Sequence, residues 1–196
     1  METSNNLHKT LTEKELEEIE RIKTEVHKIP NFPSEGILFY DIFSILRNPE
    51  LTEILFSISE KIITEMQKDP ELSFNTIVGL ESRGFLLGMV LADRLKLPFV
   101  PIRKKNKLPG DCYKVNYTTE YSNDAFEIQK NAINEKSKIL IIDDLLATGG
   151  TLKAAESLAK LANAKVNGFF TVFEIEFLKG KEKLENKDKS FSLIQI

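Results

Sequence analysis

Apolar residues recur along the chain with two spacings, one typical of helices and the other of strands. Over 12–29 they stand three or four positions apart as far as Ile29, which predicts an amphipathic helix that Pro30 ends. Thr12 and Glu15 have the spacing of a capping box at the start of this helix. Three more helical patterns follow: one that begins at the Asn48-Pro49 pair, and one each over 85–95 and 152–162.

Apolar runs too short for helices lie between these patterns and predict strands. They cover 76–79, 98–103, 125–129, 138–143, 166–175 and 191–196. Strands that alternate with helices indicate an α/β fold, with a mostly parallel twisted sheet flanked by helices. Ligands in such folds bind beyond the carboxyl ends of the strands. Segments 81–84, 104–123 and 143–150 stand at such ends and are the candidate site.

Composition narrows the class of protein. The 196 residues suit one ordinary domain, and a hydrophobic content of 41% is enough for its core. A net charge of −3 and a pI near 5.6 argue against a nucleic-acid binder, which usually has a basic face. The apolar runs are too short to cross a bilayer, and the single cysteine, Cys112, cannot form an internal disulfide. We therefore expect a cytoplasmic protein that binds neither nucleic acid nor membrane.

The segment 143–151 carries the most chemical information. Asp143 and Asp144 end an apolar strand, and a loop of small residues then opens a helix. Its glycines let backbone N–H groups approach a phosphate, and the helix N-terminus adds a partial positive charge. Adjacent carboxylates suit sugar hydroxyls better than a bare phosphate, so the segment predicts a site for a sugar 5-phosphate. Neither a Walker loop nor a GxGxxG fingerprint occurs in the chain. The plainer alternative is a strand–turn–helix corner with an aspartate cap.

The turn 81–84 follows another predicted strand. Its Arg83 suits a polyphosphate, because a guanidinium binds phosphate oxygens in pairs. Ser82 invites comparison with a hydrolase elbow, but the GxSxG pattern needs glycine where Leu80 stands. Both histidines lie in or before the first helix, so no base accompanies this serine. A surface arginine on an ordinary turn is the remaining alternative.

Segment 104–123 is polar and too long for a plain connection. Basic residues gather at its start, and Glu120 and Tyr121 stand near its end. Such a segment suits a lid that closes over a pyrophosphate and excludes water from the reaction. The alternative is a solvated charged loop.

Residues 143–151 match in full the signature of the type I phosphoribosyltransferases: two acids, two variable residues, then A/S-T-G-G-T. The chain therefore resembles that family, which implies a Rossmann-like core. The resemblance implies that ribose 5-phosphate is bound by Asp143, Asp144, Ala147, Thr148, Gly149, Gly150 and Thr151. It assigns pyrophosphate binding to Glu81, Ser82, Arg83, Arg103, Lys107 and Tyr121, with a cis peptide bond between Glu81 and Ser82.

Segments 98–110 and 118–130 are similar to the adenine phosphoribosyltransferase pattern. That likeness implies transfer of the phosphoribosyl group from phosphoribosyl pyrophosphate to N9 of adenine, giving AMP and pyrophosphate in purine salvage. Glu120 is the implied proton acceptor, and the other implied catalytic residues are Arg83, Asp143 and Asp144. Residues 29–42 resemble the hood that covers the purine in this family. The adenine contacts implied are Leu38, Phe39, Tyr40 and Leu145, and the departures from the family pattern are Tyr40, Asn106 and Ser122.

The predicted organisation has a flexible terminus over 1–11, a helix and base-binding hood over 12–45, and a core over 46–196 with a flexible lid at 104–123. The resemblance further implies a homodimer and Mg²⁺, held mainly by substrate and water without direct protein ligands. Two alternatives stay open. One is the same fold acting on hypoxanthine, guanine or xanthine, and the other is a non-catalytic regulator that binds phosphoribosyl pyrophosphate as an effector.

Overall fold

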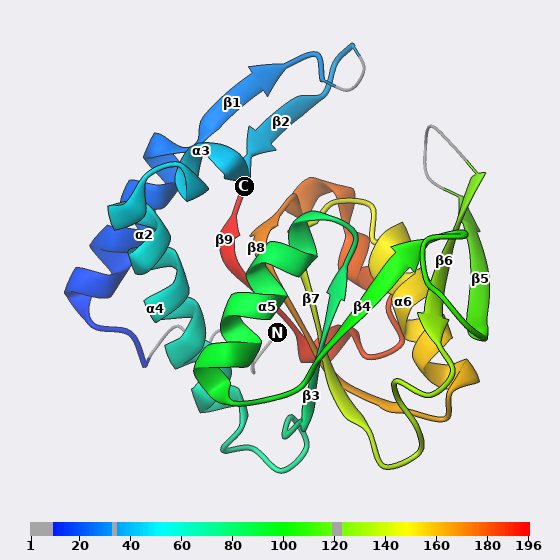
Figure 1. The fold of residues 1–196 in the computed structure, drawn as a ribbon. Helices are drawn as coiled ribbons and strands as arrows, with labels where there is room; N and C mark the ends of the chain where they lie inside the picture. Colours follow the sequence, from blue (N-terminus) through cyan, green and yellow to red (C-terminus); the bar gives the residue numbers. More distant parts are fainter. Residues whose placement is uncertain (1–9, 33–34, 119–122) are drawn as a thin grey trace.

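The computed structural model describes residues 10–32, 35–118 and 123–196. A seven-stranded sheet lies between helices, and a separate two-stranded hairpin stands beyond one end of it (Figure 1). The strands are β1 (His27–Pro30), β2 (Leu38–Asp41), β3 (Thr76–Leu80), β4 (Phe99–Lys104), β5 (Cys112–Thr118), β6 (Asn123–Gln129), β7 (Lys138–Leu146), β8 (Lys165–Glu174) and β9 (Ser190–Gln195). The helices are α2 (Glu13–Glu25), α3 (Ile42–Leu46), α4 (Pro49–Met66), α5 (Arg83–Leu95) and α6 (Gly150–Leu161), with the 3-10 turns η1 (Glu176–Leu178), η2 (Gly180–Lys183) and η3 (Lys187–Lys189).

The large sheet has the strand order β5-β6-β4-β3-β7-β8-β9. The five strands from β4 to β9 in that order pair in parallel, and β6 pairs antiparallel with both β4 and β5. The predicted α/β fold with a mostly parallel sheet is confirmed. The carboxyl ends of β3, β4 and β7 meet at one edge, which brings the three candidate segments together (Figure 1).

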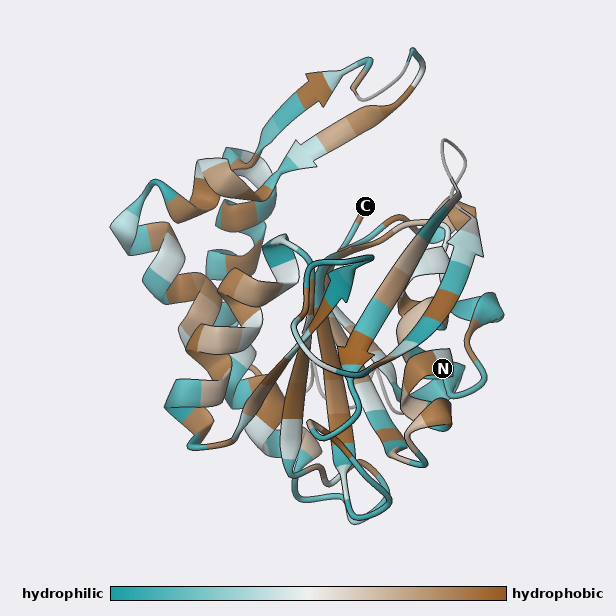
Figure 2. Cartoon of the chain, turned by 45° about the vertical axis from the view of Figure 1, so that its right-hand side comes forward, coloured by the Kyte–Doolittle hydropathy of each residue, from teal (hydrophilic) through white to brown (hydrophobic). Residues whose placement is uncertain are grey.

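Alternating residues of the central strands face two hydrophobic clusters. Ile77 and Leu140 pack with α2, α4 and α5 on one face, whereas Val78 and Ile141 pack with α6 on the other. Figure 2 shows these strands as brown ribbons between the helices. Because both faces are covered, the strands read as continuous apolar runs rather than as alternating patterns.

The first predicted helix is confirmed at its start and wrong at its end. Thr12 and Glu15 form the capping box. The helix ends at Glu25, and Ile29 lies instead in β1, which pairs with β2 in an antiparallel hairpin. Ile29 precedes Pro30, and a residue before proline disfavours the helical conformation. Pairing of β1 with β2 satisfies the backbone N–H and C=O groups of this segment instead. Leu11, which we expected in a flexible terminus, is buried in the core. Residues 1–9 lie outside the described part of the chain.

The predicted loop over 104–123 is wrong for much of its length, because β5 forms a hairpin with β6. Tyr113, Val115 and Tyr117 alternate with polar residues and pack against the cluster under α6. The polar residues between them gave the segment the overall composition of a loop. Residues 119–122, between the two strands, lie outside the described residues.

Helix α4 begins where the sequence predicts. The Asn48 side chain accepts the N–H groups of Glu50 and Leu51 at 3.0 and 3.4 Å, and Pro49 occupies the first turn. α4 has 18 residues and an apolar face that packs on the core. Within 10–32, 35–118 and 123–196, no helix is long and apolar enough to cross a membrane.

Candidate active site

Strand β7 brings the acid pair to the carboxyl edge of the sheet, and the loop that follows opens α6. Gly149, the N-cap of α6, has a φ of +77°, which glycine adopts without strain. The first N–H groups of α6 have no partner inside the helix and are free to bind an anion. The acid-bearing end of β7 packs against the turn after β3, since a Cβ on Gly84 would lie 2.6 Å from the carbonyl oxygen of Ile142 and 3.3 Å from Cα of Asp143. The turn 81–84 and the acid pair, far apart in the sequence, are therefore neighbours.

The two acids differ in their surroundings. Asp144 is buried, and its Oδ2 lies 2.6 Å from Nε of Arg83. Burial raises the pKa of Asp144, and the charge of Arg83 opposes that rise. Burial, followed by the charge of Asp144, raises the pKa of Asp143 well above its ordinary value. Strongly raised carboxyl pKa values are typical of functional sites, because a fold gains no stability from forcing two acids together.

Glu81 directly follows β3, beside the end of β4, and its peptide bond to Ser82 is cis, as the family resemblance implies. Its carboxylate accepts the Lys104 N–H at 2.8 Å and contacts the Arg103 guanidinium at 3.3 Å. Burial alone would raise the pKa of Glu81, but these two contacts outweigh burial and hold that pKa below its ordinary value. Glu81 is therefore an anion that fastens the end of β4 to the turn 81–84.

A pocket opens where these turns meet. It is lined by Glu81, Ser82, Arg83, Lys104, Asp143 and Thr151. The structure thus brings together five residues that the sequence assigns to two different parts of the substrate. Lys104 is the sixth; it begins the predicted segment 104–123, but no contact of its own is assigned to it from the sequence. The sequence signal for Lys104 was the run of basic residues over 103–107, but only the pairing of strands shows which lysine reaches the pocket. The Nζ of Lys104 also lies 3.1 Å from Asp124 Oδ2.

The hairpin β1–β2 provides the predicted hood and stands beyond the carboxyl edge of the sheet (Figure 1). Phe39 packs edge-on against Phe32 with ring centroids 5.0 Å apart, and the Arg83 guanidinium lies 5.4 Å from the Phe39 ring centroid. Tyr40 turns to the other side and packs against Phe173 at 5.8 Å. Arg83 therefore joins the hood to the acid pair.

Other predicted residues differ in how the structure places them. Leu38 is exposed, and Leu145 is half-buried at the edge of the same cluster as Tyr40. Arg103 donates to the carbonyl oxygen of Lys107 at 2.9 Å, besides its contact with Glu81. Asn106 takes a left-handed conformation with a φ of +63°, which asparagine tolerates. The three remaining positions, Glu120, Tyr121 and Ser122, lie outside the described residues.

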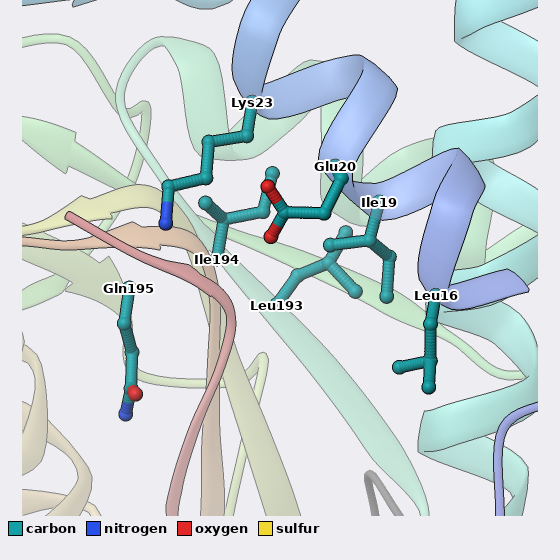
Figure 3. A pocket seen from close by; sticks show the side chains of 7 residues that line it. All are labelled: Leu16, Ile19, Glu20, Lys23, Leu193, Ile194 and Gln195. Carbon is teal, nitrogen blue, oxygen red and sulfur yellow. The ribbon is translucent and has the colours of Figure 1, made fainter. Parts of the chain in front are cut away.

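A second groove lies between α2 and the edge strand β9 (Figure 3). Leu16, Ile19 and Leu193 form its apolar floor, and Lys23 and Gln195 stand at its rim. It contains no acid pair, no helix N-terminus and no turn after a strand of the site. The chemistry therefore points to the pocket between β3, β4 and β7.

Comparison with known proteins fits this geometry. Residues 43–195 match the family model described as "Phosphoribosyl transferase domain". The chain belongs to the phosphoribosyltransferase family.

Its relatives narrow the class further. The chain is 48% identical to adenine phosphoribosyltransferase 1 of Saccharomyces cerevisiae over 165 residues, which cover 84% of this chain and 87% of the relative. It is 42% identical to adenine phosphoribosyltransferase of Drosophila pseudoobscura pseudoobscura over 87% of this chain and 92% of the relative. The predicted similarity to the adenine phosphoribosyltransferases is confirmed.

Solved structures of adenine phosphoribosyltransferases have the same fold as this chain. A crystal structure of the S. cerevisiae adenine phosphoribosyltransferase, in complex with an imino-altritol bisphosphate and adenine, superimposes with a TM-score of 0.85 at 45% identity. The match covers 91% of this chain and 99% of that one. The Giardia lamblia enzyme, complexed with 9-deazaadenine, gives a TM-score of 0.82 at 37% identity over 91% and 97% of the two chains.

Proposed function

We propose that the protein transfers the phosphoribosyl group of phosphoribosyl pyrophosphate to N9 of adenine, releasing AMP and pyrophosphate. One observation supports this most directly. Arg83 pairs with Asp144 of the sugar-phosphate turn and lies over Phe39 of the hood. The sugar site and the base site therefore meet at a single side chain, as a reaction that joins a base to a sugar requires.

The 5-phosphate binds at the start of α6. There the N–H groups of the first turn and the hydroxyls of Thr148 and Thr151 donate to its oxygens, and the helix dipole stabilises its charge. Asp143 and Asp144 accept hydrogen bonds from the ribose hydroxyls. As the bond to pyrophosphate breaks, positive charge develops on the ribose, and the nearby carboxylates stabilise it.

Pyrophosphate, the leaving group, lies over the turn 81–84. Lys104 and Arg83 line this part of the pocket and neutralise its charge. Arg103 and Lys107 close over it from the end of β4 and the residues that follow that strand. Glu81 acts through Arg103, which it holds in place, because a bare carboxylate facing pyrophosphate would be repelled.

The donor set also fits Mg²⁺. Asp143 offers carboxylate oxygens beside the pocket, and oxygen ligands are what this ion prefers. Among the described residues, no group of three or more His, Cys, Asp and Glu side chains is arranged to hold a metal ion. We therefore propose that Mg²⁺ would be held mainly by substrate and water, and that it would supply charge neutralisation at the pyrophosphate.

Adenine stacks on Phe39, with Leu145 on the opposite side. Its N6 donor and N1 acceptor are read by backbone groups near Leu38 and Tyr40, which tolerates the tyrosine at position 40. Glu120 takes the proton released from the purine as the new bond forms and returns it in the reverse reaction.

Two observations support the proposed homodimer and the proposed cytoplasmic location. Leu86, Met89 and Val90 are exposed on one face of α5, and a second copy of the chain that covers this face forms the proposed homodimer. A net charge of −3 and an unpaired Cys112 favour a cytoplasmic protein that binds no nucleic acid.

An assay with four nucleobases tests the proposal against both alternatives. The protein is incubated with Mg²⁺, phosphoribosyl pyrophosphate and adenine, hypoxanthine, guanine or xanthine in turn, and the nucleotide formed is measured. We expect AMP from adenine alone. Product from a 6-oxopurine would favour the first alternative, and binding of phosphoribosyl pyrophosphate without any product would favour the regulator.

A further inference from the structure

The segment between β8 and β9 passes directly behind the phosphate loop 147–151. A Cβ built on Gly149 would lie 2.2 Å from the carbonyl oxygen of Gly180, and a Cβ on Gly180 would lie 2.1 Å from the carbonyl oxygen of Ala147. Two backbones are thus in contact with no side chain between them. The backbone of Gly180 therefore forms a wall directly behind the phosphate loop.

A buried carboxylate on α6 fastens this segment. Glu156 is fully buried, and it accepts the backbone N–H groups of Glu185 and Asn186, each at 3.1 Å. The Asn186 side chain adds a third hydrogen bond at 2.9 Å, and Lys153 Nζ lies 3.1 Å from the same carboxylate. A buried charge is tolerated only when it is paired in this way. These bonds fix the far end of the segment to the helix that the phosphate loop opens.

The near end of the segment is fastened as well. Lys181 Nζ lies 2.7 Å from the buried Glu174 at the end of β8, and Leu184 packs into the cluster that contains Leu146 and Leu152. The segment is therefore held by Glu174 at one end and by Glu156 at the other. Between these two attachments, Gly180 lies against the phosphate loop.

We infer that Glu156 is a positioning residue for phosphoribosyl pyrophosphate: through 179–186 and Gly180 it holds the phosphate loop in its binding conformation. Glu156 lies at the far end of the segment from Gly180 and is not among the residues lining the pocket. The inference rests on the proposed function, because it gives this loop the 5-phosphate as its ligand.

Glu156→Gln tests the hydrogen bonds that hold 185–186 to α6, and Gly180→Ala tests the backbone contact of Gly180 with the phosphate loop. An amide nitrogen cannot accept a hydrogen bond, so Glu156→Gln sets a donor against a backbone N–H and loosens 185–186. Displacing binding groups by about 1 Å can cost up to about 100-fold, so we expect the KM for phosphoribosyl pyrophosphate to rise about 10–100-fold in either variant. The KM for adenine should stay within about twofold, because the proposed adenine contacts Phe39 and Leu145 lie on β2 and β7 and not on this segment.

Matched controls separate positioning from general loss of stability. Glu185→Gln removes an exposed carboxylate that pairs with Lys153 and Lys160 but leaves the Glu156 hydrogen bonds in place. Gly168→Ala crowds the ends of the Leu140 and Met66 side chains at 3.0 Å, away from the loop. Both controls should keep the wild-type KM for phosphoribosyl pyrophosphate. If the test variants raise both KM values equally, or match their controls, the inference is wrong.

Amide hydrogen exchange of the wild-type protein gives a second test that needs no variant. Ribose 5-phosphate should slow exchange at 149–151 and also at 185–186, because ordering the loop orders the segment fastened behind it. Slower exchange at 149–151 alone would contradict the inference and leave the proposed function intact. No slowing at either place would count against the proposed function itself.

Discussion

Asp143→Asn is expected to stabilise the fold while it destroys activity. The pKa of Asp143 is raised well above its ordinary value by burial and by the charge of Asp144. A folded-state pKa above the unfolded one means that stability is lost as pH rises from about 4 through the folded pKa. At neutral pH, the Asp143 carboxyl group therefore makes the fold less stable than it is at about pH 4. The amide that replaces the carboxylate keeps the oxygen that accepts the Asp144 N–H at 3.0 Å, so the substitution removes the charge without removing the hydrogen bond.

The size of the effect follows from the same surroundings. A single stabilising substitution commonly contributes about 0.5–2 kcal/mol, and we expect that range here. For a chain of this length, about 1 kcal/mol shifts the melting temperature by roughly 2–4 °C, so we expect a rise of roughly 1–8 °C at pH 7. Turnover should fall by about 10²–10³-fold, since a group that stabilises developing positive charge is lost.

Asp144→Asn is the matched comparison. Its charge pairs with Arg83 at 2.6 Å, so removing it leaves the Arg83 guanidinium without that partner and offsets any relief. We expect the melting temperature of Asp144→Asn to lie below that of Asp143→Asn, by calorimetry at pH 7. The gap between Asp143→Asn and wild type should close as the pH falls toward about 4. A variant at Asp143 that melts at or below wild type at pH 7 would refute the reasoning.

Three further predictions concern the base site, the proton acceptor and the first helix. Phe39→Ala should raise the KM for adenine about 10-fold, through loss of about 1–3 kcal/mol of stacking, and leave that for phosphoribosyl pyrophosphate within about twofold; equal changes in both would contradict a stacking role. Glu120→Leu should lower turnover by about 10²–10⁴-fold with little change in affinity for phosphoribosyl pyrophosphate, and unchanged single-turnover rates would remove Glu120 from the mechanism. The Lys61 hydrogen bond and the Thr12 N–H lower the pKa of Glu15 to about 2. The stability that the Glu15 carboxylate gives the fold is therefore lost as pH falls from 4.5 to about 2. Glu15→Gln should therefore cost up to about 1 kcal/mol in urea unfolding at pH 7 but almost nothing at pH 2, since the pair is partly exposed.

The parts of the site that the sequence predicts are those whose chemistry is local. The loop 147–151 lies between a strand and a helix, so its residues alone define a phosphate cradle. The contact of Arg83 with both Asp144 and Phe39 joins three distant segments, and only the strand order shows that they meet. Phe39 by itself is indistinguishable from an ordinary core residue.

The strands missed in the sequence share a physical cause. In β5, polar residues on the open face interrupt Tyr113 and Val115, so no apolar run stands out. In β1, helical spacing continues past the real helix end, and pairing with β2 overrides it. The contact of Gly180 with the phosphate loop has no local signal in the sequence either, because a glycine at this position predicts only a turn.

A crystal structure with bound AMP tests the central claim most directly. We expect the phosphate on the N–H groups at 149–151, the ribose hydroxyls on Asp143 and Asp144, and the purine between Phe39 and Leu145. A phosphate bound anywhere other than the start of α6, with the hood left empty, would contradict the account.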